Sequence, residues 1–195
     1  MNLHFPKKLV IGLTGSILSG KSTALGYFKK YGAGVLSADE ICHRLYQQPR
    51  IQAELNKRFG SCEPAELSAK VFRDSSFRKK LESFLHPLIL RYAADVIRQD
   101  SSPIVVFEVP LLFESDWDKK VDISLFIQAD CKTLSARLKG RKMTRAEYLR
   151  RLRTQMPEKE KFLRADITVF HKSKKELANK IQHLYQAFCA VSEQL

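Results

Sequence analysis

Residues 15–22 carry the pattern that constrains this chain most: they read GSILSGKS and satisfy G-x-x-x-x-G-K-[ST] in full. So short a pattern also occurs by chance, and its flanks decide whether it has a function. The apolar run of residues 8–14 is typical of a buried strand, and residues 22–30 have the apolar spacing of a helix. This order of strand, glycine-containing turn and helix predicts a loop that binds phosphate, here called the phosphate loop.

The residue types of the phosphate loop define its chemistry. Gly15 and Gly20 permit backbone angles that turn successive N–H groups inward, as an anion-binding nest at a helix N-terminus. Lys21 reaches the β- and γ-phosphates of a nucleoside triphosphate, and the hydroxyl of Ser22 is a ligand for Mg²⁺. We therefore predict that the chain binds a nucleoside triphosphate together with Mg²⁺.

Two carboxylates end predicted strands. Glu108 closes the apolar run that begins at Ile104, and Asp39 closes a shorter strand, residues 34–39. The carboxyl ends of strands border the ligand crevice in open α/β sheets, so we expect Asp39 to face the phosphates. There Asp39 can accept the proton of an attacking hydroxyl, and Glu108 can hold Mg²⁺ directly or through water. Two simpler alternatives stay open: Glu108 only terminates its strand, and Asp39 caps the helix that begins at Glu40.

Strands and helices alternate along most of the chain. Further strands are predicted at residues 122–127 and 167–170, and a closing helix at 174–192. Residues 40–99 form an almost wholly helical block. This block is punctuated at Pro49, Gly60, Pro64 and Pro87. The alternation predicts an α/β fold, a three-layer α/β/α sandwich of the P-loop type around a parallel sheet.

Composition limits the classes of binding partner and the cellular compartment that we expect. The net charge of +13 and the pI near 9.7 suit nucleic acid, an anionic membrane surface or a small molecule with several phosphates. No apolar stretch approaches the roughly 18–20 residues that span a bilayer. The N-terminus also lacks a signal-peptide core, so we expect a cytoplasmic protein. The four cysteines show no CxxC pairing, which favours free thiols over a zinc site or disulfides.

Residues 132–155 predict a basic helix with a break near Gly140. Phosphoryl transfer requires positive charge around the transferred group and exclusion of water, and a mobile segment that carries guanidinium groups supplies both on closing. Arg137 and Arg141 lie on one helix face because they are four residues apart. We favour Arg141 first and Arg137 second for this role, while a solvated basic face is the alternative.

Several segments, in order over essentially the whole chain, match one known family. They are Ile11–Thr23, Ser37–Ile41, Val71–Asp74, Leu81–Ile89, Val109–Glu114, Arg137–Arg141, Arg151–Gln155 and Ala165–Asp166. With these segments the chain resembles dephospho-CoA kinase. Many NTPases share the phosphate loop, whereas His86-Pro87 followed by Pro110–Glu114 is much more specific to this family.

The resemblance implies transfer of phosphate from ATP, with Mg²⁺, to the ribose 3′-hydroxyl of dephospho-CoA, which is the last step of coenzyme A biosynthesis. It also implies one domain over residues 1–195. The nucleotide-binding core would comprise about 8–40, 103–131 and 165–195, the acceptor-binding helical subdomain about 41–100, and the lid about 132–160.

The implied site residues fall into four groups. ATP would contact Gly15, Leu18, Ser19, Gly20, Lys21, Ser22, Thr23, Arg137 and Arg141; the acceptor would contact Asp39, His86, Pro110, Leu111 and Leu112; the catalytic residues would be Asp39, Lys21 and Arg141; and Mg²⁺ would be held by Ser22 and Glu108. For His86, a purely structural role as a packed or capping residue is the alternative.

The chain departs from the family pattern in three places. Ser16 and Leu18 stand where the family has glycine, and because leucine adopts positive φ only at a cost, we predict an ordinary backbone conformation for Leu18. Residues 62–64 replace a Leu-Asp-Arg triplet of the family, so its arginine is missing here. A neighbouring cation could take its place: Lys57, Arg58 or Lys70. Residues 171–173 replace an Asn-x-Gly that lies near the adenine in the family, so we expect the contacts to the base to differ from those of the family.

Two further functions stay open. The first is another small-molecule kinase, acting on a nucleotide or nucleoside, which would share the fold and differ in its acceptor site. The second is a nucleic-acid-binding P-loop protein, which the charge of +13 suggests although no nucleic-acid-binding motif accompanies it.

Overall fold

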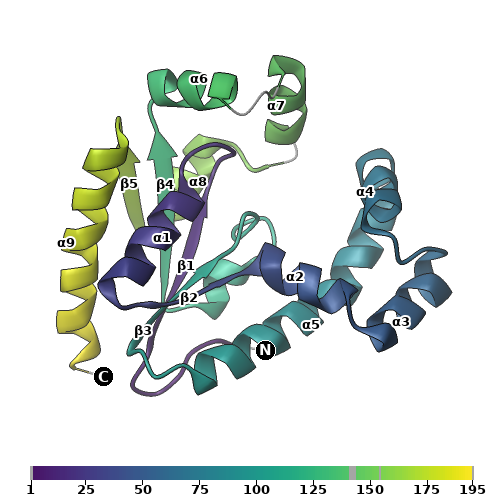
Figure 1. Ribbon diagram of the computed structural model, residues 1–195, viewed down its shortest axis with the longest axis horizontal. Coiled ribbons are helices and arrows are strands. Elements are labelled where there is room, and N and C mark those ends of the chain that lie inside the picture. Colours follow the sequence, from purple (N-terminus) through teal and green to yellow (C-terminus); the bar gives the residue numbers. More distant parts are fainter. Residues whose placement is uncertain (1, 141–143, 154, 195) are drawn as a thin grey trace. The chain divides into compact units, whose positions relative to one another are not determined.

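The computed structural model describes residues 2–140, 144–153 and 155–194 (Figure 1). The chain divides into two compact units, which are described separately. One contains Ser37–Arg98, and the other contains Asn2–Leu36 and Gln99–Leu195. The second unit carries the phosphate loop.

A five-stranded sheet forms the centre of the fold, in the order β2-β3-β1-β4-β5. These strands are β1 (Leu9–Gly15), β2 (Gly34–Ser37), β3 (Ile104–Glu108), β4 (Ile123–Ala129) and β5 (Ile167–His171). Strand β1 pairs in parallel with β3 and with β4, and β4 pairs in parallel with β5. The predicted parallel sheet with flanking helices is therefore confirmed.

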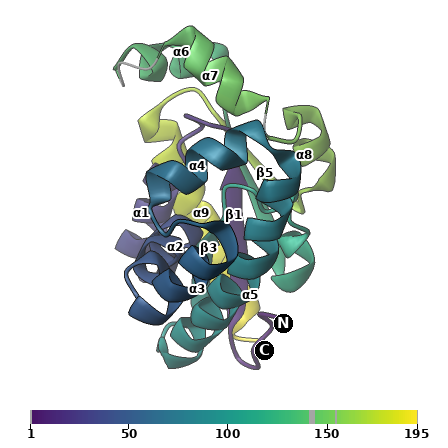
Figure 2. The ribbon, with the colours of Figure 1, turned by 90° about the vertical axis from the view of Figure 1, so that its right-hand side faces the viewer.

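Strand β1 is buried along its whole length, as expected for a central strand covered on both faces. Helices α1 (Lys21–Tyr31) and α9 (Lys174–Ser192) run beside the sheet in Figures 1 and 2. They contribute to one apolar core with alternate residues of β1. Its largest side chains include Phe28 and Phe188, whose rings stack with centroids 6.3 Å apart. This core supports the strand that ends in the phosphate loop.

The other unit is helical and contains α2 (Ala38–Tyr46), α3 (Pro49–Phe59), α4 (Pro64–Arg73) and most of α5 (Ser75–Gln99). Proline stands in the first turn of α3 and α4, where its missing N–H costs no helical hydrogen bond. Gly60 ends α3 in the left-handed conformation, with φ of 73°. The predicted punctuation at Pro87 is wrong: α5 continues through it, with the proline itself exposed.

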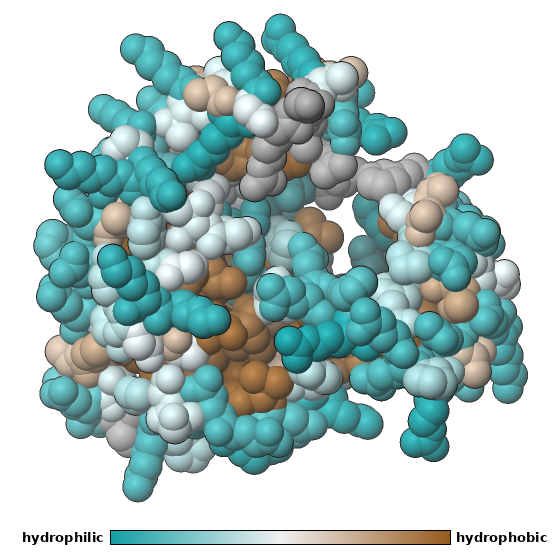
Figure 3. Space-filling model, in the orientation of Figure 1, coloured by the Kyte–Doolittle hydropathy of each residue, from teal (hydrophilic) through white to brown (hydrophobic). Residues whose placement is uncertain are grey.

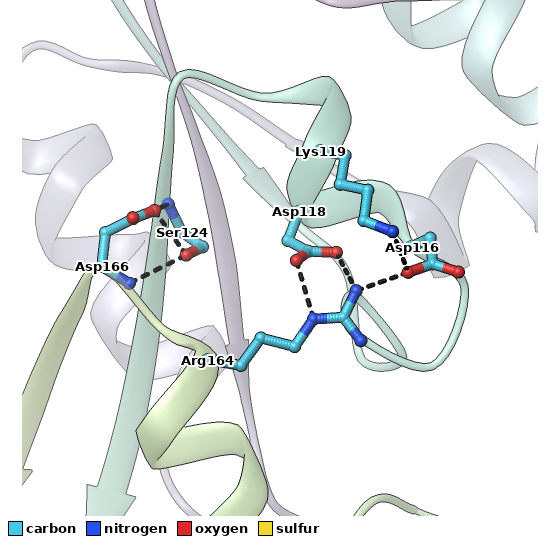
Figure 4. A network of polar contacts seen from close by, with 6 residues as sticks. All are labelled: Asp116, Asp118, Lys119, Ser124, Arg164 and Asp166. Carbon is cyan, nitrogen blue, oxygen red and sulfur yellow. Dashed lines mark hydrogen bonds and ion pairs between the residues drawn. The ribbon is translucent and has the colours of Figure 1, made fainter.

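Three helices lie between β4 and β5: α6 (Cys131–Gly140), α7 (Arg145–Leu152) and α8 (Glu158–Arg164). The break that the sequence predicts near Gly140 separates α6 from α7, whereas α8 was not predicted. At the end of α8, the Arg164 guanidinium binds both carboxylate oxygens of Asp118 at 2.8 Å and Asp116 at 2.6 Å (Figure 4). These bonds join α8 to the short 3₁₀ helix η1 (Trp117–Lys120) that precedes β4.

The face drawn in Figure 3 carries both kinds of side chain: hydrophilic ones cover most of it, and a group of hydrophobic ones is exposed among them. Among the described helices, none combines the length and apolar character needed to cross a membrane. The four cysteines are free thiols, as the sequence predicts.

Candidate active site

The phosphate loop connects β1 to α1, and its two glycines are required for different reasons. Gly20 has φ of 105°, a left-handed conformation that side chains rarely adopt. Gly15 does not have positive φ, so the prediction that it supplies special backbone angles is wrong. A Cβ at Gly15 would instead lie 2.5 Å from the carbonyl oxygen of Ile127 in β4. Close approach of two strands therefore excludes a side chain there.

The prediction for Leu18 is also wrong, because its φ is 66° and thus left-handed. Such a conformation costs on the order of 1–3 kcal/mol for a non-glycine residue and persists only where its surroundings hold it. Two contacts do so. The leucine side chain is buried, with 7% exposed, and its carbonyl oxygen accepts a hydrogen bond of 2.8 Å from Nη1 of Arg137. Tertiary contacts therefore override the local preference of leucine.

Lys21 is directed back over the loop that it follows. Its Nζ donates to the carbonyl oxygens of Gly15, at 2.8 Å, and Ser16, at 3.2 Å. The ammonium group thus lies beside the loop backbone, and its predicted contact with the phosphates of a bound triphosphate stays a prediction.

The two predicted ligands of Mg²⁺ lie together. The Ser22 hydroxyl, in the first turn of α1, donates a 3.2 Å hydrogen bond to Oε1 of Glu108 at the end of β3. The register pairs Glu108 with Leu13, two residues before the loop begins, and the carboxylate is largely buried. One hydroxyl and one carboxylate are hard oxygen donors that fit Mg²⁺, which usually keeps several waters and takes its other ligands from phosphate. Among the described residues no cluster of three or more His, Cys, Asp or Glu offers an all-protein metal site.

Asp39 lies in the other unit, as the second residue of α2 and two residues after β2 ends at Ser37. The alternative in which it caps the helix is wrong, since α2 begins at Ala38 with Ser37 as its N-cap. Its side chain is exposed and borders a surface hollow of about 350 Å³ with Glu40, His43 and Arg44. Burial raises the pKa of the nearby Cys42 thiol to about 11, and the negative charge of Asp39 contributes to this shift as the smaller cause. The predicted contact of Asp39 with the acceptor stays a prediction.

His86 lies in the same helical unit as Asp39, in the middle of α5. Its side chain is half-buried, and this burial lowers the pKa of the imidazole, although the charge of Glu82 one turn earlier opposes the shift. Burial of this kind fits the structural alternative, and the predicted contact with the acceptor stays a prediction.

The segment Pro110–Leu112 follows β3 in the unit that holds the phosphate loop. The Thr14 hydroxyl donates to the carbonyl oxygen of Pro110 at 3.2 Å, which ties this segment to the end of β1. Leu112 is completely buried, and its side chain fills the space beside Gly12. Pro110 and Leu111 are half-buried. The contact of all three residues with an acceptor stays a prediction.

The structure describes only one of the two arginines that the sequence favours for the lid. Arg137 on α6 reaches the phosphate loop, whereas Arg141 lies outside the described residues. Two of the three cations proposed to replace the missing family arginine have partners within the helical unit. Arg58 pairs with Glu54 at 2.8 Å, and Lys70 donates to the carbonyl oxygen of Phe59 at 3.2 Å.

Sequence reasoning missed two side chains that contact the phosphate loop. His171, at the end of β5, is completely buried, and its Nε2 lies 2.8 Å from the carbonyl oxygen of Ser19. Oε1 of Gln155 accepts a 3.3 Å hydrogen bond from the N–H of Ile17. The next residue, Met156, donates its N–H to Glu114 at 2.7 Å. Gln155 and Glu114 both end segments that match the family pattern, but residue type alone did not indicate these contacts.

Comparison with known proteins decides the family. The family model described as dephospho-CoA kinase matches residues 9–176. The chain belongs to the dephospho-CoA kinase family. It is 35% identical over 190 residues to the dephospho-CoA kinase of Bartonella quintana, with 90% of this chain and 94% of the relative covered. It is 36% identical over 197 residues to that of Burkholderia pseudomallei, with 93% and 97% covered.

Solved structures agree with the fold. A crystal structure from Thermus thermophilus superposes with a TM-score of 0.81 at 30% identity, covering 96% of this chain and 98% of that one. A dephospho-CoA kinase from Campylobacter jejuni has a TM-score of 0.60 at 22% identity, covering 93% and 97%. At that identity the second likeness supports the fold alone. The family resemblance and the P-loop kinase fold that the sequence predicts are therefore confirmed.

Proposed function

We propose that this chain transfers the γ-phosphate of ATP to the ribose 3′-hydroxyl of dephospho-CoA, giving coenzyme A and ADP. The observation that carries the proposal is the pairing of Ser22 with Glu108 beside a complete phosphate loop, in a chain of the dephospho-CoA kinase family. Mg²⁺, when bound at Ser22 and Glu108, would neutralise charge on the phosphates.

The remaining roles follow from the chemistry of phosphoryl transfer. The 3′-hydroxyl oxygen forms a bond to the γ-phosphorus, the bond from that phosphorus to the β–γ bridging oxygen breaks, and ADP leaves with the electron pair. Asp39 takes the hydroxyl proton, for which an exposed carboxylate is suited. Gly15, Gly20 and Lys21, with the backbone of Leu18–Thr23, hold the phosphates of ATP.

The acceptor would be bound by Asp39, His86 and the segment Pro110–Leu112. Residues 132–160 would act as a lid, with Arg137 and Arg141 supplying positive charge when it closes. The role of Arg137 is supported by its hydrogen bond to the carbonyl oxygen of Leu18, which brings the guanidinium group to the phosphate loop.

The test compares acceptors. Purified chain with ATP and Mg²⁺ is assayed for ADP release with dephospho-CoA and, in parallel, with nucleoside monophosphates, and the product is checked by mass for a phosphate on the 3′-oxygen. We expect turnover of dephospho-CoA. Turnover confined to a nucleoside monophosphate would favour the alternative kinase. Tight, salt-sensitive binding of nucleic acid without any kinase activity would favour the P-loop nucleic-acid-binding alternative.

A further inference from the structure

His171 is a buried side chain that the mechanism above does not use. It is the last residue of β5, with none of its surface exposed, and it pairs with Ala129 at the end of β4. Its Nε2 lies 2.8 Å from the carbonyl oxygen of Ser19, and its Nδ1 lies 3.2 Å from the carbonyl oxygen of Ser173. One imidazole thus joins the end of the sheet to the phosphate loop and to the N-cap of α9.

The contact with Ser19 defines the direction of the next N–H group. Both ring nitrogens face carbonyl oxygens, which only accept, and a neutral imidazole carries one hydrogen. We assign that hydrogen to Nε2, because its contact is the shorter of the two, 2.8 Å against 3.2 Å. The peptide between Ser19 and Gly20 is trans and planar, and its C=O and N–H therefore point in opposite directions. When His171 holds the carbonyl on one side, the N–H of Gly20 is turned to the other side.

That N–H belongs to the residue that precedes α1. Gly20 is the N-cap of α1, where backbone N–H groups have no partner within the helix and bind anions. Its φ of 105° lies in the left-handed region, which glycine adopts readily. Rotation of the Ser19–Gly20 peptide would turn this N–H away from an anion bound at the N-terminus of α1.

A second side chain holds the preceding carbonyl. Arg137 binds the carbonyl oxygen of Leu18, so two consecutive carbonyls of the loop are each fixed by a side chain from a different element. The two side chains differ in their setting. Arg137 lies on α6, in the proposed lid, whereas His171 lies within the paired part of the sheet. His171 would keep its contact when the lid moves.

We propose that His171 is a positioning residue for ATP: its Nε2–H holds the Ser19 carbonyl and thereby directs the N–H of Gly20 toward the bound phosphates. The inference rests on the proposed function only in taking ATP as the nucleotide. It predicts a defect in nucleotide binding that does not depend on which acceptor the chain uses.

The test uses two side chains of similar length that differ in their ability to donate. His171→Gln retains an N–H donor, and His171→Met does not. His183→Met, at an exposed position within α9, is the control. The measurements are the Kd of Mg²⁺ with a non-hydrolysable ATP analogue, without acceptor, and kcat/KM for ATP. Thermal unfolding and circular dichroism check that each variant folds.

A hydrogen bond of ordinary strength corresponds to about a two- to tenfold change in affinity. We expect His171→Met to bind the analogue about two- to tenfold more weakly, His171→Gln to recover most of the loss, and the control to match the original chain. Equal affinity of His171→Met and His171→Gln, whether both normal or both reduced, would overturn the proposal. If the original chain binds the ATP analogue but does not turn over dephospho-CoA, the result would count against the proposed function and leave this inference standing.

If His171→Met does not fold, nitrogen-15 NMR of the unsubstituted chain decides the question. We expect Nε2 of His171 to carry a slowly exchanging hydrogen, whose signal shifts when the ATP analogue binds. An unprotonated Nε2, or a signal that the analogue leaves unchanged, would overturn the proposal.

Discussion

The hydroxyl of Ser22 and the carboxylate of Glu108 are joined by a 3.2 Å hydrogen bond, although 86 residues separate them in the chain. This pair is the part of the site that depends most directly on the sheet, because one residue lies in the first turn of α1 and the other ends β3. The pair also yields the first prediction.

Glu108→Gln should weaken the apparent affinity for Mg²⁺ by about 10- to 100-fold, the range found when a partner of a metal site is lost. Glutamine keeps the shape and can still accept a hydrogen bond from Ser22, so the fold should survive. The measurement is the rate of turnover as a function of Mg²⁺ at saturating ATP. An unchanged Mg²⁺ dependence would remove Glu108 from the metal site.

Lys21→Ala should lower kcat/KM for ATP by about 10²–10³-fold, the usual effect of losing one group that stabilises developing charge. The ammonium already contacts the loop carbonyls of Gly15 and Ser16. Lys29→Ala, at an exposed position at the other end of α1, is the matched control and should leave the kinetics unchanged. Similar kinetics for the two variants would contradict the role given to Lys21.

Asp39→Asn should leave the affinity for ATP nearly unchanged and lower kcat by about 10²–10⁴-fold, as expected for loss of a general base. Asparagine is close in shape and cannot take the proton. Single-turnover kinetics separate the chemical step from product release. Turnover at the original rate would show that Asp39 does not act as the base.

Gly15→Ala and Gly26→Ala should have opposite effects on stability. A Cβ at Gly15 meets the carbonyl oxygen of Ile127 at 2.5 Å and the Ser19 hydroxyl at the same distance, so strands or loop must shift. Around Gly26, within α1, a Cβ meets no atom within 4 Å. We expect the first variant to lose stability and ATP binding, and the second to gain about 0.5–1 kcal/mol. Chemical denaturation with both variants at one pH measures the difference, and a stable Gly15→Ala that binds ATP normally would refute the close-approach argument.

His86 should make the stability of the chain depend on pH below neutrality. Burial lowers its pKa in the folded state, whereas the unfolded state keeps the ordinary value of about 6.5. Between these two values the unfolded state binds more protons, so the free energy of unfolding falls as the pH falls through about 6.5 and levels off below the folded pKa. His86→Gln should show a smaller loss than the original chain, and His183→Gln, at an exposed site, the same loss. Equal pH dependence in all three proteins would be evidence against a lowered pKa.

The sequence predicts the sheet, the phosphate loop and the helical block well, because each depends on local patterns of apolar residues and on a short motif. The conformation of Leu18 could not be predicted from its own preference, since a buried side chain and an arginine 119 residues away hold it. His171 was seen as a departure near the base, but its contact with Ser19 spans 152 residues. Helix α8 was missed because its few apolar residues show no strong period.

The pairing of β3 with β1 has a consequence for how the chain can vary. Side chains along a strand alternate between the two faces of a sheet, so a slip of one residue would move Glu108 to the opposite face from Ser22. Two bonds before β3 resist such a slip: the N–H of Leu9 donates to the carbonyl oxygen of Pro103 at 2.8 Å, and Nζ of Lys8 donates to that of Ser102 at 3.2 Å. Insertions between α5 and β3 are therefore tolerable only if they bulge outward before residue 102 and leave the strand length from there to the carboxylate unchanged.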